Sequence, residues 1–269
     1  MCNILEVARS GYYAWTGRPP SGQTLRRGQV VEQIRRVHQQ SRGTYGSPRV
    51  HAELKEQGVT VCLNTVAKYM GQERIASKVM RPFRVITTDS CHDRPVAPNR
   101  LERRFQTEEP NRTWCCDITY VPTDEGFLYV AAVIDCCTRR IVGWAMADHL
   151  RTELCLGALR MAVMRRRPGP GLLHHSDRGL QYASQAYREF LDRQRMTASM
   201  SGRGNCYDNA MMESFWSTLK RELVHHERYA TREAARRSLF EYIEVFYNRQ
   251  RRHSAIGYVS PEAFEASLN

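Results

Sequence analysis

The sequence has few of the features that mark membrane, secreted or zinc-binding proteins. It holds no run of about 18 apolar residues and no signal-peptide core, so neither a membrane span nor secretion is predicted. Its nine cysteines are odd in number and form no CxxC pair, which disfavours a disulfide framework or a structural zinc site. The doublets Cys115–Cys116 and Cys136–Cys137 lie in apolar runs, where thiols act as small hydrophobes. We therefore expect reduced cysteines in a cytoplasmic protein.

Acidic residues are scarce in the first part of the chain. The whole chain has a net charge of +12, with 40 Lys and Arg against 28 Asp and Glu. Residues 1–104 carry 18 of the basic and 8 of the acidic side chains, whereas residues 105–269 are nearly balanced. A polyanion such as DNA is the expected partner, and the basic first part is its expected docking surface.

The first part also shows the pattern of a small all-α domain. Apolar residues recur at helical spacing over 24–40, and shorter helices are predicted over 49–57 and from Asn64 or Thr65 to about 73. Ser47 is expected to cap the second helix, with Pro48 as its first residue. Two short helices joined by a brief turn in a basic segment favour a helix-turn-helix, and a plain helical bundle is the alternative. The candidate DNA contacts here are Arg26, Arg27, Arg35, Arg36, Arg49 and Lys68.

The later part alternates strands and helices, which is the pattern of an α/β domain. Strands are predicted over 113–121, 127–134, 140–147, 172–176 and 197–200, the first three as an antiparallel meander. Helices are predicted over 152–166, 184–195, 208–223 and about 231–250. The predicted divisions are an N-terminal segment 1–20, a helix-turn-helix domain 21–77, a basic linker 78–108, a catalytic core 109–225 and a C-terminal helical extension 226–269. The last helix is expected either to flank the active site or to mediate subunit contacts.

Three acidic residues carry the functional signal. Asp117 lies midway along the first predicted strand, Asp177 directly follows the fourth, and Glu213 lies on a later helix. Because 35 residues separate Asp177 from Glu213, the carboxylates can meet only if a sheet brings two strands together and the helix crosses them. Hard divalent cations offset the electrostatic repulsion between neighbouring carboxylates, and two such ions about 4 Å apart support phosphoryl transfer. We predict that all three residues are catalytic metal ligands.

Neighbouring polar residues receive other expected roles. Lys220 lies two helical turns after Glu213 on the same face and is expected to reach a phosphate at the metal site. Asp135 is expected to pair with Arg139 or Arg140, and Asp208 to cap the following helix. The last expected DNA contacts are His174, His175 and Arg178.

Several segments together resemble a known family. They are Tyr45–Val50 (YGSPRV), Asn64–Met70 (NTVAKYM), Pro95–Asn99 (PVAPN), Leu101–Phe105, Trp114–Tyr120 (WCCDITY), His175–Tyr182 (HSDRGLQY), Gly204–Trp216 (GNCYDNAMMESFW) and His253–Pro261 (HSAIGYVSP). They resemble the DDE transposases of the insertion-sequence-three family, which are relatives of retroviral integrases, and they span nearly the whole chain.

The resemblance implies a fold, a reaction and partners. It implies an RNase H-like mixed five-stranded sheet flanked by helices, with Asp117, Asp177 and Glu213 binding two Mg²⁺ ions, for which Mn²⁺ substitutes. The enzyme would nick DNA at the terminal inverted repeats of its element and direct the freed 3′-OH to a new phosphodiester. Such enzymes would join one end to the other on the same strand, form a circular intermediate and integrate it into target DNA. The chain, which has no heptad stretch, matches the downstream reading-frame product of the family. It is therefore expected to work as a homo-oligomer, in part with the upstream reading-frame product, at the bacterial nucleoid.

Two other functions remain open from the residues. One is an RNase H-like nuclease without strand transfer, and the other is a non-catalytic DNA-binding regulator. The intact acids and Lys220 favour the strand-transfer enzyme over both.

Overall fold

The computed structural model describes residues 8–78, 95–202 and 206–268. The chain divides into two compact units, Met1–Lys78 and Val79–Asn269. Residues 79–94 of the predicted linker lie outside the described residues, as do residues 203–205. No helix in the described ranges is long and apolar enough to cross a membrane. The six cysteines whose side chains the structure describes, Cys62, Cys115, Cys116, Cys136, Cys137 and Cys155, are all free.

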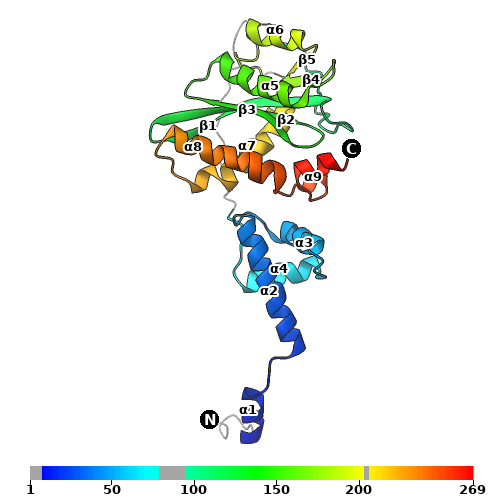
Figure 1. Ribbon diagram of the computed structural model, residues 1–269, viewed down its shortest axis with the longest axis vertical. Helices are drawn as coiled ribbons and strands as arrows, with labels where there is room; N and C mark the ends of the chain where they lie inside the picture. The colour runs from blue at the N-terminus through cyan, green and yellow to red at the C-terminus, as the bar shows by residue number, and fades with distance from the viewer. Residues whose placement is uncertain (1–7, 79–94, 203–205, 269) are drawn as a thin grey trace. The chain divides into compact units, whose positions relative to one another are not determined.

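The first unit is a three-helix core preceded by a short helix (Figure 1). Its helices are α1 (Arg9–Thr16), α2 (Gly22–Gln40), α3 (Ser47–Glu56) and α4 (Leu63–Gln72). One apolar stripe from each of the last three helices is buried: Val30, Ile34 and Val37 from α2, Val50 and Leu54 from α3, and Val66 and Met70 from α4. Helix α1 contributes no buried residue.

Two helix starts in this unit differ from the sequence prediction. The N-cap of α3 is Gly46 and no side chain caps it, so Ser47 is already the first helical residue. Helix α4 begins at Leu63, because the amide of Val66 donates to the carbonyl oxygen of Cys62 at 3.1 Å. Backbone hydrogen bonding extends both helices by one or two residues beyond the polar residues that signal a cap.

The second unit is built on a five-stranded mixed sheet. Its strands are β1 (Thr113–Thr123), β2 (Gly126–Asp135), β3 (Ile141–Ala147), β4 (Leu173–Ser176) and β5 (Thr197–Met200), in the order β3-β2-β1-β4-β5. The first three form the predicted antiparallel meander, and β4 and β5 run parallel to β1. The mixed sheet matches the fold that the resemblance implied.

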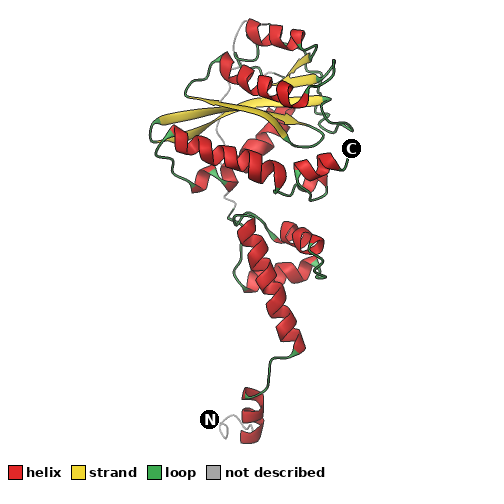
Figure 2. Ribbon diagram, in the orientation of Figure 1, coloured by secondary structure: helices red, strands yellow, loops and turns green. Residues whose placement is uncertain are grey.

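Helices cover both faces of this sheet (Figure 2). Helices α5 (Thr152–Arg166) and α6 (Gln185–Arg193) lie on one face, and α7 (Ala210–Glu222), α8 (Arg232–Phe240) and α9 (Pro261–Ala266) lie toward the other. A short 3₁₀ turn, η1 (Cys206–Asn209), leads into α7, and another, η2 (Val224–His226), follows it. This three-layer order buries the sheet and places α7 along β1.

Gly143 on β3 allows α5 to lie directly on the sheet. A Cβ atom at this position would clash with the carbonyl oxygen of Ala158 and would come within 2.6 Å of the amide nitrogen of Ala162. Both of these atoms are backbone, so no side-chain movement relieves the clash. The absence of a side chain at Gly143 therefore sets the distance between α5 and β3.

The helix predicted over about 231–250 is present, but it is not α-helical throughout. Helix α8 passes into a π-helical segment, η3 (Glu241–Tyr247), and a 3₁₀ turn, η4 (Ser254–Ile256), precedes α9. The wider π turn brings two pairs of large side chains into the core, Tyr242 with Ile243 and Phe246 with Tyr247. The spacing of these four residues also suits one face of an α-helix, and this is why the sequence pattern does not reveal the π turn.

The described end of the predicted linker is packed onto the second unit. Leu101 is buried. The amides of Arg100 and Leu101 donate to the hydroxyl oxygen of Ser199 on β5, at 2.9 and 3.2 Å. Residues 95–108 thus belong to the second unit.

Candidate active site

The parallel pairing of β1 with β4 brings two of the predicted acids to neighbouring positions. The last paired residues of this ladder are Cys116 and Ser176. Asp117 and Asp177 each follow directly, so they extend from adjacent strands that lie about 4.8 Å apart. The ladder register therefore places two carboxylates beside each other at the carboxyl end of the shorter strand.

Helix α7 carries the third acid across β1. Two hydrogen bonds fasten this helix to the strand: Asn209 Nδ2 donates to the carbonyl oxygen of Cys116 at 3.0 Å, and Trp216 Nε1 donates to Asp117 Oδ2 at 3.1 Å. Glu213 lies between the two donors at four and three residues' distance, which is the spacing of one helical face. Its side chain is exposed, so the helix presents this carboxylate at an open surface.

The three carboxylates act on one another electrostatically. Burial raises the pKa of Asp117 well above its usual range, and the charge of Asp177 and then that of Glu213 add to the shift. The indole of Trp216 opposes this shift by donating to the carboxylate. Asp117 thus sits in a concentration of negative charge that disfavours its own ionisation.

Lys220 lies at the same site. Its ammonium is 5.2 Å from the centre of the Tyr120 ring on β1. Burial lowers the pKa of Lys220, and the negative charge of Asp117 acts in the opposite direction. A half-buried cation close to Asp117 is placed to meet a phosphate, and its DNA contact stays a prediction.

The donor set suits a hard divalent cation. Within the described residues, no three His, Cys, Asp or Glu side chains are already spaced to enclose an ion. The available donors are nevertheless oxygens, and Asn209 adds an Oδ1 atom that is buried without a hydrogen-bond partner in the described part of the chain. Converging carboxylates beside an unsatisfied amide oxygen have the chemistry that Mg²⁺ prefers, directly or through its bound water.

The turn after β4 fixes the second acid. The amide of Gly179 donates to Asp177 Oδ1 at 2.9 Å, and a Cβ atom at Gly179 would lie 3.0 Å from that same oxygen. Arg178 donates from Nε to the carbonyl oxygen of Ser201 at 2.7 Å. Part of the Arg178 guanidinium therefore ties this turn to the end of β5, and its contact with DNA stays a prediction.

The expectation that His174 and His175 contact DNA is wrong. Both side chains are buried. His174 Nε2 lies 2.9 Å from both Cys116 Sγ and Tyr187 Oη, and His175 Nδ1 lies 2.8 Å from Ser199 Oγ. Burial lowers the pKa of His174 to about 3 and that of His175 to about 4, so both rings are neutral at physiological pH. They are core residues that join β4 to its neighbours.

Asp135 has a structural role, but not the predicted ion pair. Its carboxylate accepts hydrogen bonds from the Asn111 amide at 2.6 Å, from Trp114 Nε1 at 3.2 Å and from the Thr138 amide at 2.9 Å. Arg140 instead pairs with two acids of α9, Glu262 and Glu265. The carboxylate of Asp135 therefore closes the turn between β2 and β3.

Asp208 does not cap α7 as predicted. It lies within η1, and Asn209 holds the cap position without a side-chain cap bond. The Asp208 carboxylate accepts from Asn99 Nδ2, Arg103 Nε and the Gly202 amide at 3.0, 3.0 and 2.8 Å. Asp208 thus connects the segment before β1 to the approach to α7.

Sequence reasoning missed a buried ion pair at the end of α7. Glu222 accepts from Arg251 at 2.7 and 2.8 Å and from the Tyr242 hydroxyl at 2.8 Å. The side chains of Glu222 and Arg251 are only 3% and 5% exposed. The pair ties the helix that carries Glu213 and Lys220 to the C-terminal region. Long separation in sequence and the absence of a local motif hid it.

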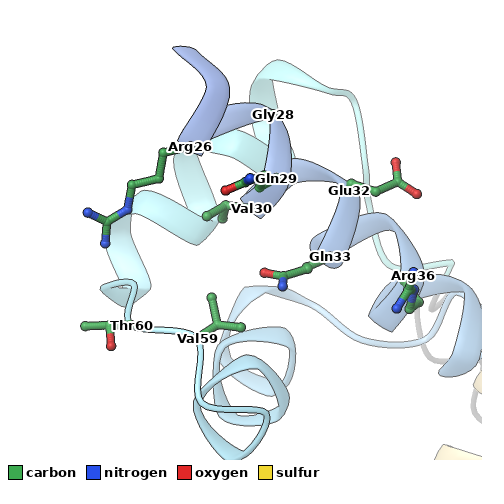
Figure 3. A pocket seen from close by; sticks show the side chains of 9 residues that line it. All are labelled: Arg26, Gly28, Gln29, Val30, Glu32, Gln33, Arg36, Val59 and Thr60. Carbon is green, nitrogen blue, oxygen red and sulfur yellow. The ribbon is translucent and has the colours of Figure 1, made fainter. Parts of the chain in front are cut away.

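Four of the predicted DNA contacts of the first unit lie on α2 and fall into two pairs with different surroundings. Arg27 and Arg35 both approach Glu73, at 3.6 and 2.7 Å, whereas Arg26 and Arg36 lie along an open cleft of about 710 Å³ (Figure 3). The cleft lies between α2 and the turn that precedes α4.

The remaining two predicted contacts lie on α3 and α4. The Arg49 guanidinium is 5.8 Å from the centre of the Tyr45 ring. Lys68 is exposed on α4. The DNA contacts of all six basic residues stay predictions.

Comparisons with known proteins agree with this geometry. An integrase core domain family matches residues 107–206, a second integrase core family matches residues 194–261, and an HTH-like domain family matches residues 26–83. One solved structure, described as a simian T-cell lymphotropic virus intasome in complex with PP2A regulatory subunit B56 gamma, superposes with a TM-score of 0.50 at 13% identity, over 86% of this chain and 74% of that chain. This likeness concerns the fold: an integrase-type, RNase H-like core.

Full-length relatives define the family. A Shigella sonnei protein described as "Insertion element IS600 uncharacterized 31 kDa protein" is 46% identical over 264 residues, which cover 98% of this chain and 97% of the relative. "Transposase InsF for insertion sequence IS3A" from Escherichia coli (strain K12) is 41% identical over 267 residues, covering 98% and 92%.

An integrase core together with an HTH-like unit defines an enzyme of the transposase and integrase class, a polynucleotidyl transferase that binds DNA. Within that class, the chain belongs to the transposases of the IS3 family of insertion sequences.

Proposed function

We propose that Asp117, Asp177 and Glu213 together bind two Mg²⁺ ions, for which Mn²⁺ substitutes, and that this site cleaves DNA and transfers the freed 3′-OH. The observation that carries the proposal is the β1–β4 register that places Asp117 beside Asp177, with the helix that bears Glu213 hydrogen-bonded to β1. The charges of Asp177 and Glu213 accordingly raise the pKa of Asp117. A cluster of this kind lowers the stability of a protein unless a cation offsets it, so its presence points to a ligand. When bound, the metal ions would activate the attacking oxygen and stabilise the leaving oxygen.

The residues around the acids have distinct tasks in this proposal. Trp216 and Asn209 hold α7 on β1, so that Glu213 stays beside the two aspartates. Lys220 neutralises a DNA phosphate at the site and so favours the approach of the scissile strand. Cleavage yields a 3′-OH, and in the second step this oxygen attacks a target phosphodiester and displaces its bridging 3′ oxygen.

The first unit supplies most of the affinity for DNA. The exposed side chains of Arg26, Arg36 and Lys68 contact phosphates of the terminal inverted repeats, and these contacts release counterions. The working complex is a homo-oligomer that holds two element ends, assembled at the nucleoid in part with the upstream reading-frame product.

A strand-transfer assay tests the proposal. Wild type and the Glu213→Gln variant are incubated with Mg²⁺ and target DNA, together with terminal DNA that is either pre-nicked or un-nicked. Joined product from wild type, and none from the variant, is expected. Cleavage of un-nicked ends without joining would make the protein a nuclease, and DNA binding without either reaction would make it a regulator. Either result contradicts the proposal.

A further inference from the structure

Three of the four tryptophans donate an indole hydrogen bond to an acidic side chain. Trp114 donates to Asp135 at 3.2 Å, Trp144 to Glu244 at 2.7 Å and Trp216 to Asp117 at 3.1 Å. The first two acids are satisfied by further donors: Asp135 closes a turn, and Glu244 also pairs with Arg165 at 2.6 Å. Only in the third pair is the acid one of the proposed metal ligands.

The surroundings of Asp117 set this third bond apart. Trp216 donates a side-chain hydrogen bond to one carboxylate oxygen of Asp117, Oδ2, and the backbone amide of Ile118 also hydrogen-bonds to this carboxylate. Directional donors restrict the rotation of a carboxylate about its Cβ–Cγ bond. Oδ1 is thereby kept as the oxygen without this donor. The indole bond consequently helps to set the orientation in which the Asp117 carboxylate meets a ligand.

The position of Trp216 on α7 gives the bond a second effect. Trp216 lies three residues after Glu213, and its side chain is only 6% exposed. Phe215 packs against it, with ring centres 4.7 Å apart, so the indole has little freedom to turn. The same hydrogen bond that orients Asp117 thus also fixes the position of Glu213 along β1.

We propose that Trp216 is a positioning residue of the metal site: its indole N–H orients the Asp117 carboxylate and holds it in register with Glu213. This inference rests on the proposed function of the three acids. Partners that orient ligating side chains change metal affinity by about 10- to 100-fold when they are removed. A residue that merely fills the core would change stability and leave the affinity of a folded protein unaltered.

The Trp216→Phe variant tests the proposal, and Trp144→Phe is its matched control. Both substitutions keep an aromatic ring and remove an indole–carboxylate hydrogen bond, but Glu244 is not one of the proposed ligands. Binding of Mn²⁺ to the full chain is measured by electron paramagnetic resonance of the free ion, with melting curves to establish that each variant is folded. Asp117→Asn is included to show which part of the binding belongs to the proposed site.

The expected result is that Trp216→Phe binds Mn²⁺ about 10- to 100-fold more weakly than wild type, while Trp144→Phe remains within about twofold of it. If Trp216→Phe and Trp144→Phe bind Mn²⁺ equally well while Asp117→Asn loses binding, only the proposed role of Trp216 would be overturned. Unchanged binding in Asp117→Asn would overturn the proposed metal site itself, so the two failures are distinguishable.

A second measurement tests the role of Trp216 without substituting it. The ¹⁵N-labelled wild-type chain has four indole N–H groups, one for each tryptophan. Titration with Mg²⁺ is expected to shift the Trp216 indole resonance and leave that of Trp144 in place, with assignments from Trp144→Phe and from the Asp117→Asn spectrum. A Trp216 resonance that does not move while Mg²⁺ binds would contradict the proposal.

Discussion

Replacing Asp117 by Asn is expected to stabilise the metal-free protein while abolishing its activity. Asp117 and Asp177 extend from adjacent strands, and the charge of Asp177 raises the pKa of Asp117. Two unit charges about 6 Å apart, at the effective dielectric constant of about 20 that suits partly buried sites, repel by about 3 kcal/mol. Asp177 is partly exposed, so a gain of about 1–3 kcal/mol is expected when the repulsion is removed.

The pH dependence of this gain follows from the direction of the shift. Because the folded-state pKa of Asp117 is raised, folding of the wild type becomes less favourable as pH rises from the unfolded-state pKa of about 3.9 through the folded-state value. The stabilising effect of Asp117→Asn should therefore be large at neutral pH and should disappear below about pH 4.

Thermal melting in EDTA, at pH 7.5 and at pH 4, measures the effect. A gain of 1 kcal/mol corresponds to about 2–4 °C in a domain of this size. Addition of Mg²⁺ should raise the melting temperature of the wild type more than that of the variant. A variant that melts below the wild type in EDTA at pH 7.5 would refute the claim that Asp117 is electrostatically destabilised.

Two further predictions concern the arginines and the buried ion pair. The double variant Arg26→Ala, Arg36→Ala should weaken DNA binding and reduce the slope of log affinity against log salt concentration by up to about 0.9 per lost phosphate contact. Fluorescence anisotropy across a salt series measures both quantities. The double variant Arg27→Ala, Arg35→Ala should have the smaller effect, because both of these side chains approach Glu73. The reverse order would place the DNA footprint elsewhere. Glu222→Gln should lower the unfolding free energy by about 3–5 kcal/mol in urea melts, because it leaves Arg251 buried and unpaired, and Glu222→Met with Arg251→Met should restore much of that loss. Equal destabilisation of the single and double variants would contradict this view of the pair.

The sequence was sufficient for most of the second unit. The strand periods and the turn signals predicted the meander of β1, β2 and β3 to within two residues, because apolar alternation and turn residues are local properties. The helix 152–166 was predicted with the bounds that α5 has. The positions of Asp117 and Asp177 relative to the strands were also correct, since strand ends are readable from the sequence.

Features that depend on contacts between distant segments were not predicted. In the sequence, His174 and His175 have the pattern of polar residues at the end of a strand. In the structure, Ser199 of β5 contacts His175 and Tyr187 of α6 contacts His174. Contacts with such later segments cannot be read from the local sequence. The bond from Trp216 to Asp117 spans 99 residues, and that from Arg251 to Glu222 spans 29. The π-helical segment η3 follows from the burial of Tyr242 and Tyr247 against the rest of the fold, which no period in the sequence reveals.

Anomalous diffraction from crystals of the wild-type chain soaked in Mn²⁺ is the measurement that addresses the metal site most directly. We expect anomalous peaks within ligand distance, about 2.0–2.3 Å, of carboxylate oxygens of Asp117, Asp177 and Glu213, and their loss in Glu213→Gln crystals. Manganese bound at full occupancy elsewhere, with none at these three side chains, would contradict the account.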